Sequence, residues 1–371
     1  MFVTDKIDNI ATLKAGGDAP KNISPIRTQD CCYPIYSNGI NNEGLYGYTD
    51  KYTMPANTIT ISARGTIGAV FYRNEPYFPI VRLISLTPNY DIVHAKYLYY
   101  LLKSLPIEGF GSVQQQLTIP YYKKTKITFV ESLETQDRIA SVLSTYDGLI
   151  EKNNRKIEIL QDMAEELYKE WFVRFRFPGY KTAKFTDGIP DGWEVKRCGD
   201  ISMIKAGGDA PKEYSEKKTD KYKYPIFSNG ISEDGLYGYT DKPSIKEESI
   251  TISARGTVGY VCLRNEPYLP IVRLLVIVPN TEIVSNIFLY MYFKHNATEG
   301  YGTSQQQITV PYFKKKKILL PSQELVNRYT EYVEPFFMEI RKLKQLNSNL
   351  TIQRDLLLPC LMSGKHAVKV S

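Results

Sequence analysis

Two short motifs are similar to part of an amino-methyltransferase site, yet they lack residues that the reaction needs. TIPYY (118–122) and TVPYF (309–313) resemble an Asn/Asp-Pro-Pro-Tyr/Phe motif. Methyl transfer to an amine needs a polar first residue that orients the amine and a rigid Pro-Pro pair, and both are absent. The glycine-rich segments EGFGS and EGYGT do not open a βα unit that would hold a methyl donor. The sequence therefore predicts no methyltransferase centre in this chain.

A second motif contains the residue types of a metal-dependent nuclease. Pro190, Asp191, Glu194 and Lys196 follow the order Pro-Asp…Glu-x-Lys. Asp191 and Glu194 are close together in the chain and follow a turn, so they cannot lie on adjacent strands around a magnesium ion. The motif also occurs once, whereas other blocks of this chain are duplicated. We expect no nuclease site here.

Histidines and cysteines show no catalytic or metal-binding spacing either. The cysteines are odd in number and have no C-x-x-C pair, which fits neither a disulfide framework nor a zinc site. No apolar run reaches the roughly 18–20 residues of a membrane span, and the amino terminus does not resemble a signal peptide. These features predict a cytoplasmic protein without a metal site. The histidines are His94, His295 and His366, and the cysteines are Cys31, Cys32, Cys198, Cys262 and Cys360.

Residues suited to binding DNA occur in blocks that are present twice. Arg64 and Arg255 lie in the segment SARGT, where the glycine lets the backbone approach closely and the guanidinium can take a guanine edge or a phosphate. The alternative is an internal pair with a carboxylate. Three consecutive glutamines, at 114–116 and 305–307, carry amides suited to adenine, or else they are solvated or hold their loop. The net charge of +7 is weak support for a nucleic-acid partner.

Asparagines and lysines complete the set of candidate DNA-binding residues. Asn38 and Asn229 precede a glycine, where an asparagine either contacts a base or simply makes a turn. The lysines are better suited to phosphate contacts, with a plain solvated face as the alternative. The full set is Lys21, Asn38, Arg64, Thr66, Gln114, Gln115, Gln116, Lys123 and Lys124 in the first half, and Lys212, Asn229, Arg255, Thr257, Gln305, Gln306, Gln307, Lys314 and Lys315 in the second.

The chain is a tandem repeat with an offset of 191 residues. Residues 14–124 align with 205–315 without a gap, and about 63 of the 111 positions are identical. The shared blocks include KAGGDAPK, ITISARGT and RNEPYxPIVRL. Short β-branched and aromatic runs bounded by Gly, Pro and Asn predict a mainly β domain in each copy, with a short helix at 91–104 and 282–294.

A long amphipathic helix is predicted after each copy, at about 131–172 and 322–361. Apolar residues recur there every three or four positions, which is typical of a coiled-coil-like seam. Met163, Trp171, Leu325, Tyr332 and Leu357 belong to this pattern. The residues predicted to pair the helices or contact a partner are Ile139, Val142, Tyr146, Leu149, Ile157, Leu160, Leu167, Tyr329, Phe336, Ile340, Leu343 and Leu350.

The order domain, helix, domain, helix predicts that the helices pair in antiparallel fashion. A helix of about 38 residues is roughly 57 Å long and delivers the chain to the second domain at its far end, so the second helix must run back. A pseudo-twofold axis would then relate the two halves. The predicted fold is mixed α/β (α+β), with mainly β domains at 1–130 and 189–321, a central helix and linker at 131–188, and a distal helix and tail at 322–371.

The whole chain resembles the specificity subunit of type I restriction–modification systems, in which two target-recognition domains alternate with two conserved helical regions. KILLPSQELVNRYTEYV (317–333) resembles the opening of such a helical region, and ITFVESLETQDRIASVL (127–143) resembles it without the proline. IPDGWEVKRCGDI (189–201) is similar to the opening of a recognition domain. RDLLLPCLMSGK (354–365) is similar to the family's carboxyl terminus.

The resemblance implies a sequence-specific DNA-binding subunit that is not itself an enzyme. Its implied partners are double-stranded DNA, two methyltransferase (modification) subunits bound along the helices, and restriction subunits. S-adenosylmethionine and ATP with magnesium are expected only on those partners, so this chain is expected to hold no cofactor. A departure lies at the amino terminus, where Phe2 aligns with Trp193 but the proline-rich turn is absent. An alternative function is a non-catalytic scaffold that binds two proteins or glycans without DNA.

The near identity of the two copies implies a palindromic, interrupted DNA target. Two domains with the same reading residues should accept the same short sequence, and a twofold axis across B-DNA turns a repeated half-site into an inverted one, roughly one helical turn away. A base contact from the unlike stretch 22–32 would make the half-sites differ. We expect instead that its lysine-rich counterpart, 213–223, strengthens phosphate contacts. The other unlike stretches are 52–57 against 243–248, and 94–107 against 285–298.

Overall fold

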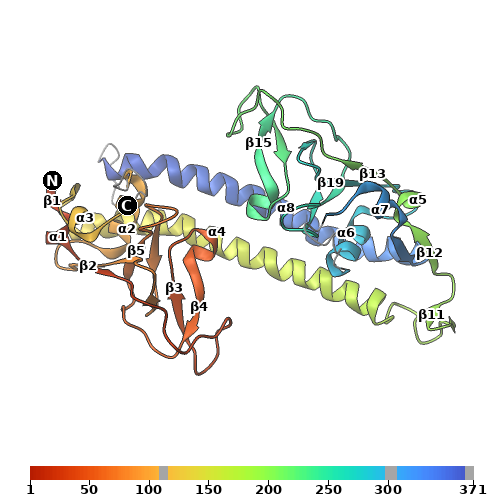
Figure 1. Ribbon diagram of the computed structural model, residues 1–371, viewed down its shortest axis with the longest axis horizontal. Coiled ribbons are helices and arrows are strands. Elements are labelled where there is room, and N and C mark those ends of the chain that lie inside the picture. Colours follow the sequence, from red (N-terminus) through yellow and green to blue (C-terminus); the bar gives the residue numbers. More distant parts are fainter. Residues whose placement is uncertain (108–115, 297–306, 364–371) are drawn as a thin grey trace. The chain divides into compact units, whose positions relative to one another are not determined.

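The structure is a computed structural model that describes residues 1–107, 116–296 and 307–363 (Figure 1). The chain divides into two compact units, Met1–Asn154 with Leu343–Ser371, and Arg155–Lys342. Each unit contains one copy of the repeat and a section of both long helices, α4 (Leu133–Tyr168) and α8 (Gln323–Met362). The unit boundaries therefore fall inside the helices, and not at the ends of the repeated domains.

The first unit contains two small sheets and one strand pair. A four-stranded antiparallel sheet has the order β2-β8-β5-β6, and a three-stranded sheet has the order β4-β3-β7 with β3 parallel to β7. Strand β1 pairs with β9 and brings the amino terminus to the start of α4. The elements are β1 (Phe2–Lys6), α1 (Ile7–Ile10), β2 (Ala11–Ala15), β3 (Tyr33–Tyr36), β4 (Leu45–Thr49), β5 (Thr58–Ile61), β6 (Val70–Arg73), β7 (Phe78–Pro79), β8 (Ile84–Pro88), α2 (Ala95–Ser104), α3 (Ile119–Tyr122) and β9 (Lys126–Val130).

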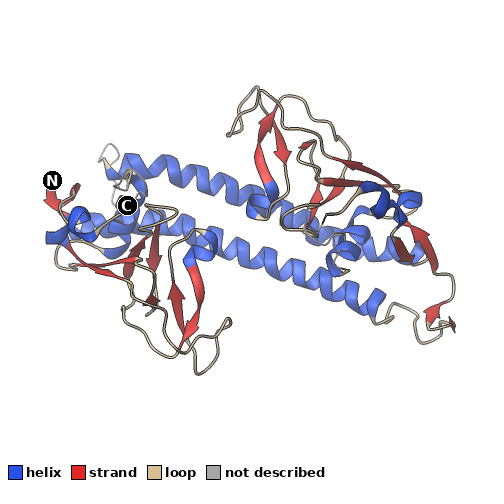
Figure 2. Ribbon diagram, viewed as in Figure 1, coloured by secondary structure: helices blue, strands red, loops and turns tan. Residues whose placement is uncertain are grey.

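The second unit repeats this topology with its own strands. Its sheets have the orders β13-β19-β16-β17 and β15-β14-β18, and β12 pairs with β20. The elements are β12 (Glu194–Arg197), α5 (Cys198–Ile201), β13 (Ser202–Ala206), β14 (Tyr224–Phe227), β15 (Leu236–Thr240), β16 (Ser249–Ile252), β17 (Val261–Arg264), β18 (Leu269–Pro270), β19 (Leu275–Pro279), α6 (Asn286–His295), α7 (Val310–Lys315) and β20 (Lys317–Leu320). A short hairpin, β10 (Phe185–Thr186) and β11 (Ile189–Pro190), precedes them (Figure 2).

The core of the first unit joins the repeated domain to both helices. Strand β5 is buried along its whole length, and α2 packs Tyr97, Leu98 and Leu101 towards it at helical spacing. Further members come from α4 (Ile139, Ala140, Leu143) and from the end of α8 (Leu358, Leu361, Met362). Segments more than 200 residues apart in the chain thus complete one hydrophobic core.

Within each unit the sections of α4 and α8 run antiparallel, as the sequence predicts. In the first unit, Arg354 binds Asp147 and Asn347 Oδ1 accepts from Asn153 Nδ2 at 2.8 Å. In the second, Lys156 Nζ lies 2.6 Å from Glu339, and the Tyr329 hydroxyl donates to the carbonyl oxygen of Ala164 at 3.1 Å. As the residue number rises along α4, that of its partner on α8 falls.

The predicted seam is correct in part. The buried members are Ile139, Ile157, Tyr329, Ile340 and Leu343, and the half-buried ones are Val142, Tyr146, Leu160, Leu167, Phe336 and Leu350.

Leu149 was predicted in the seam but is 44% exposed, and Met163 and Tyr332 are also exposed. The buried positions along this part of α4 include Ala164, whose carbonyl oxygen accepts from the Tyr329 hydroxyl at 3.1 Å. The periodicity of large apolar residues misses an alanine at such a contact.

The short helices begin later than predicted. Helix α2 starts at Ala95, because residues 89–93 form a turn in which the Asn89 carbonyl accepts from Ile92 and Val93. Helix α6 starts at Asn286, capped by the Ser285 hydroxyl, and ends at His295. In the described parts of the chain, no helix is long and apolar enough to cross a membrane, and no group of His, Cys, Asp and Glu is arranged to hold a metal.

Candidate nucleic-acid interface

The two candidate arginines are each held by a candidate glutamine. Arg64 Nε donates to Gln116 Oε1 at 2.9 Å, and Arg255 Nε donates to Gln307 Oε1 at 3.1 Å. Both arginines are exposed. The contact uses one edge of the guanidinium and a neutral partner, so it orients the side chain without neutralising its charge. In the described parts of the chain, neither arginine pairs with a carboxylate, which was the alternative that the sequence left open.

Backbone pairing explains why these residues meet although they are far apart in sequence. The amide of Leu117 donates to the carbonyl of Ala63 at 3.0 Å, and the amide of Ile308 donates to that of Ala254 at 3.1 Å. The first bond brings Gln116 beside Arg64, and the second brings Gln307 beside Arg255. Of the other predicted residues, Gln114, Gln115, Gln305 and Gln306 lie outside the described residues.

Asn38 and Asn229 have an internal role in each copy. Asn38 Nδ2 donates to the carbonyl oxygen of Val81 at 2.6 Å, and Asn38 Oδ1 accepts from the amide of Ala63 at 2.8 Å. Asn229 makes the same two bonds, at 2.6 and 2.7 Å. The amide group thus fastens three loops together. A base contact by these asparagines stays a prediction, and the two internal bonds leave less of each amide for it.

Thr66 and Thr257 lie exposed on the turns that carry the two arginines. In the first copy, the amide of Gly68 donates to Ser62 and that of Ala69 to Thr66, so the turn is closed by its own backbone. Gly65 has a φ of 68°, a left-handed conformation that glycine adopts at low cost.

The candidate lysines differ between the copies in one place. In the first copy, Lys123 Nζ is 2.8 Å from Asp8. In the second copy, the position equivalent to Asp8 is Gly199, which lies against the Lys314 side chain: a Cβ added to this glycine would be 3.1 Å from Lys314 Cβ. Lys314 therefore lacks the aspartate that holds Lys123. The remaining candidates are all exposed: Lys21, Lys124, Lys212 and Lys315.

Each copy also contains a buried arginine that was absent from the predicted set. Arg73 is 2% exposed, its guanidinium carbon lies 3.5 Å from the ring centroid of Tyr36, and it donates to Thr60 and to the carbonyl of Glu43. Arg264 repeats these contacts with Phe227, Thr251 and Asp234.

Burial lowers the pKa of Arg73 below its ordinary value, while Tyr36 and Glu43 act to raise it. The arginine ties the two sheets and the 41–44 turn into one support for the exposed loops. Its signal in the sequence is the repeated block RNEPY.

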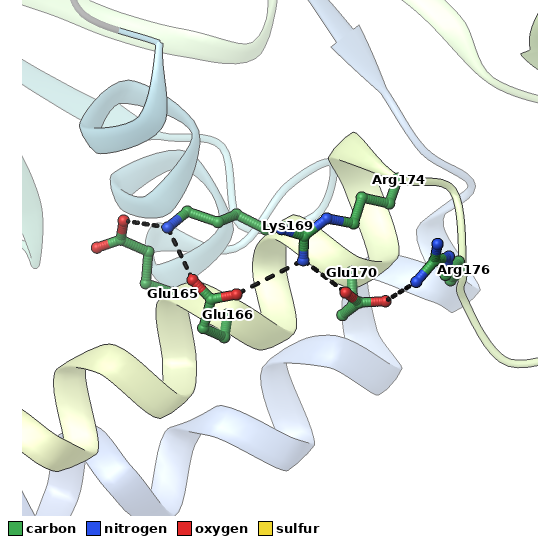
Figure 3. Close-up of polar contacts among 6 residues, drawn as sticks. All are labelled: Glu165, Glu166, Lys169, Glu170, Arg174 and Arg176. Atoms are coloured by element: carbon green, nitrogen blue, oxygen red, sulfur yellow. Dashed lines mark hydrogen bonds and ion pairs between the residues drawn. The ribbon is translucent and has the colours of Figure 1, made fainter.

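Charged residues at the end of α4 form a further polar cluster in the second unit (Figure 3). Lys169 lies between Glu165 and Glu166, and Arg174 and Arg176 both contact Glu170. Lys294 on α6 binds Glu165 at 3.0 Å and so fastens the repeated domain to α4. Burial raises the pKa of the Glu165 carboxyl, but Lys169 and Lys294 outweigh burial and hold that pKa below its ordinary value.

The fold and the duplicated polar surface define a tandem protein in which the same candidate interface occurs twice. A family model described as the type I restriction modification DNA specificity domain matches residues 2–161 and 190–351. Because these matches span most of the sequence, the chain belongs to this family, as the resemblance of its motifs implied.

Curated relatives agree with this assignment, and a solved structure has a similar fold. A putative type I specificity subunit of Mycoplasma pneumoniae is 27% identical over 339 residues, which cover 90% of this chain and 89% of the relative. The specificity subunit of the type I restriction enzyme MjaIX of Methanocaldococcus jannaschii is 29% identical, covering 95% and 88%. The fold is similar to the crystal structure of a type I restriction-modification S subunit from M. genitalium, with a TM-score of 0.61, 21% identity and coverage of 98% and 96%.

Proposed function

We propose that this chain reads a bipartite DNA sequence and directs partner methyltransferase and restriction subunits to it. Family membership supports DNA target recognition as the general role. The observation that carries the specific proposal is the duplicated arginine–glutamine pair, at 2.9 Å in one copy and 3.1 Å in the other. An exposed guanidinium that is oriented by a neutral glutamine is suited to binding a guanine edge or a phosphate.

The target is proposed to be an interrupted palindrome. The arginine–glutamine and asparagine hydrogen bonds of the two copies agree within 0.2 Å, so each copy should prefer the same short sequence. A twofold relation between the two copies on B-DNA, as the order domain, helix, domain, helix predicts, would invert the second half-site. One of the unlike stretches, 22–32, also fits this view, because its Arg27 pairs with Glu75 at 2.6 Å and its guanidinium is thus partly engaged within the protein.

The chain is proposed to act without chemistry of its own. The relatives named above are specificity subunits. S-adenosylmethionine, ATP and magnesium are accordingly proposed to bind the partner subunits, with two modification subunits docked along α4 and α8. Methyl transfer from labelled S-adenosylmethionine by the purified chain alone would contradict this proposal.

Mapping the methylated bases tests the proposed target directly. The chain is expressed with its modification subunits, and the genome of the host is sequenced for methylated adenines and cytosines. A single interrupted palindrome is the expected result, and two unrelated half-sites would refute the palindrome. A mobility-shift assay of the chain with heparin competition tests the scaffold alternative, since a scaffold for proteins or glycans would release DNA completely.

A further inference from the structure

The turn between β7 and β8 holds two residues in an unfavourable backbone conformation. Val81 and Arg82 have φ values of 54° and 61°, and their counterparts Val272 and Arg273 have 52° and 62°. Two-residue turns with positive φ at both positions normally contain Asn, Asp or Gly, because a β-branched side chain clashes with its own backbone there. Each copy of the repeat therefore keeps the same strained turn.

Surrounding contacts fix this turn from three sides. The amide of Val81 donates to Gly17 at 2.8 Å, the amide of Arg82 donates to Gly16 at 3.1 Å, and Asn38 Nδ2 donates to the Val81 carbonyl at 2.6 Å. A side chain at Gly16 would meet the Pro79 carbonyl carbon at 2.7 Å, so this close approach requires glycine. Strained residues persist where the neighbouring structure over-determines them, and they cluster at functional sites.

The second copy has the matching restraints. The amide of Val272 donates to Gly208 at 2.8 Å, and Asn229 Nδ2 donates to the Val272 carbonyl at 2.6 Å. Gly207 approaches Pro270 as closely as Gly16 approaches Pro79, with the same distance of 2.7 Å to the carbonyl carbon.

These restraints do not serve to bury the side chains of the turn. Val81 and Val272 are 51% and 47% exposed, and both arginines are exposed as well. Across residues 1–107, 116–296 and 307–363, neither Arg82 nor Arg273 takes part in an ion pair. The turn thus displays an aliphatic and a cationic side chain from a fixed backbone.

The same asparagine connects this turn to the first candidate arginine. Asn38 binds Val81, the neighbour of Arg82, through its amide nitrogen, and it binds Ala63, the neighbour of Arg64, through its amide oxygen. The backbones that carry Arg64 and Arg82 are therefore held by one side chain. In the second copy Asn229 connects Arg255 and Arg273 in the same way.

We propose that Arg82 and Arg273 are base-reading residues that act beside Arg64 and Arg255, and that Asn38 and Asn229 position both arginines of each copy. This inference rests on the proposed DNA-binding function. An arginine can donate two hydrogen bonds to O6 and N7 of guanine, and a fixed backbone reduces the conformational entropy lost on binding. The Val81 methyl groups suit contact with a neighbouring thymine methyl.

Selection of binding sites from random duplex DNA tests the inference with the full chain. Sequences bound by the wild-type chain are compared with those bound by the double variant Arg82→Ala/Arg273→Ala. The variant is expected to lose its preference for guanine at one position of each half-site and to keep the remaining motif. Because two bidentate contacts are removed, it should bind the wild-type site on the order of 30-fold to 10⁴-fold more weakly. The matched control is Arg155→Ala, an exposed arginine on α4, which should leave motif and affinity unchanged.

A lysine variant separates base reading from phosphate binding. Arg82→Lys/Arg273→Lys keeps the charge but lacks the planar pair of donors, so the guanine preference should still be lost while the salt dependence stays as in wild type. An unchanged motif in both double variants would overturn the inference, as would equal weakening on every sequence. A wild-type chain that selects no sequence would instead overturn the proposed function itself.

The positioning role of the asparagines has its own signature. Asn38→Asp/Asn229→Asp keeps the acceptor for Ala63 and Ala254 but turns the donor to Val81 and Val272 into a second acceptor. The expected result is weaker base preference at the positions read by Arg82 and Arg273, whereas the added negative charge by itself should lower the affinity for all sequences alike. Equal weakening on all sequences, with every base preference retained, would show that the asparagines have a structural role alone.

Discussion

The two copies of the repeat agree in their exposed loops and differ in how they are fastened to the helices. In the first unit a polar network links the repeated domain to both long helices, since Asp147 on α4 accepts from Tyr100 on α2 and from Arg354 on α8. Aliphatic residues of α8, among them Leu358 and Leu361, join the hydrophobic core of the same unit. The positions equivalent to Asp147, Tyr100 and Arg354 hold Phe337, Met291 and Ala164 in the second unit, so this polar network has no counterpart there.

The second unit uses aromatic packing in the same place. Phe172 lies 4.9 Å from Phe288, 5.0 Å from Tyr329 and 6.1 Å from Trp193 between ring centroids, and Tyr168 and Trp171 join the same cluster. The exposed loops, in contrast, keep their hydrogen bonds within 0.2 Å between copies. The contrast indicates that the binding surface tolerates little change, whereas a helix contact can change as long as both of its sides change together.

The largest expected effect comes from removing a ring of the aromatic cluster. Phe172→Ala should lower the free energy of unfolding of the second unit by about 3–5 kcal/mol, because it leaves a cavity among packed rings. Both tryptophans of the chain, Trp171 and Trp193, lie beside Phe172, so tryptophan fluorescence during urea denaturation reports on this unit. Met362→Ala, at the equivalent position of the first unit, is the control. A fluorescence transition shifted equally by the control would contradict the contrast between the units.

A somewhat smaller effect is expected from the polar network. Asp147→Ala should destabilise the first unit by about 1.5–3 kcal/mol, because Arg354, whose side chain is only 14% exposed, loses a charge-assisted hydrogen bond. Hydrogen exchange should accelerate in Ala95–Ser104, the helix α2 that Tyr100 fastens. Asp355→Asn removes the more exposed carboxylate on the same arginine and should cost less than about 1 kcal/mol. Equal losses in the two variants would refute the role of Asp147 as the link.

The agreement of the binding loops predicts equal effects of equal substitutions. Arg64→Ala and Arg255→Ala should each weaken binding to the specific site by about 1–3 kcal/mol if the contact is bidentate to a base. The loss of affinity is measured by titrating each variant with duplex DNA that carries the target sequence identified by methylation mapping. Lys124→Ala, the comparison variant, should weaken binding to all sequences alike. Unchanged specific affinity in the arginine variants would assign these residues a structural role.

The smallest effect concerns the one lysine that differs in its surroundings. Lys314→Gln should lower the slope of log affinity against log salt by about 1 if this lysine neutralises one phosphate. Lys123→Gln should lower it less, because Asp8 already holds Lys123. The variant Asp8→Gly removes this difference and serves as the control. A larger slope change for Lys123 than for Lys314 would contradict the prediction.

The sequence predicted the overall organisation well because repeats and periodicity record backbone structure directly. The offset of 191 residues implied two equal domains, and their strand orders are indeed the same. The antiparallel pairing followed from the order of elements alone. The extent of the units did not follow from it, since Leu358, Leu361 and Met362 join a core whose other buried members precede residue 144. No local pattern shows which distant segment completes a core.

The site was predictable as a set of residues and not as an arrangement. Identity between the copies pointed to Arg64 and Gln116 separately, but their contact depends on the pairing of Leu117 with Ala63. Asn38 looked like a turn residue because Asn-Gly is common in turns, whereas its side chain bonds to two other loops. Arg73 and Arg82 lie in the same repeated block, RNEPYxPIVRL, and only burial separates the supporting arginine from the exposed one.

The division of the chain into units has a consequence for its synthesis. The second unit, Arg155–Lys342, is continuous, whereas the first needs residues from both ends of the chain. During translation the amino-terminal domain leaves the ribosome first, yet Leu358, Leu361 and Met362 reach its core only when the last helix is complete. The domain that is made first is therefore the one that matures last, and a nascent chain stopped before Leu343 carries a whole second unit beside an unfinished first one.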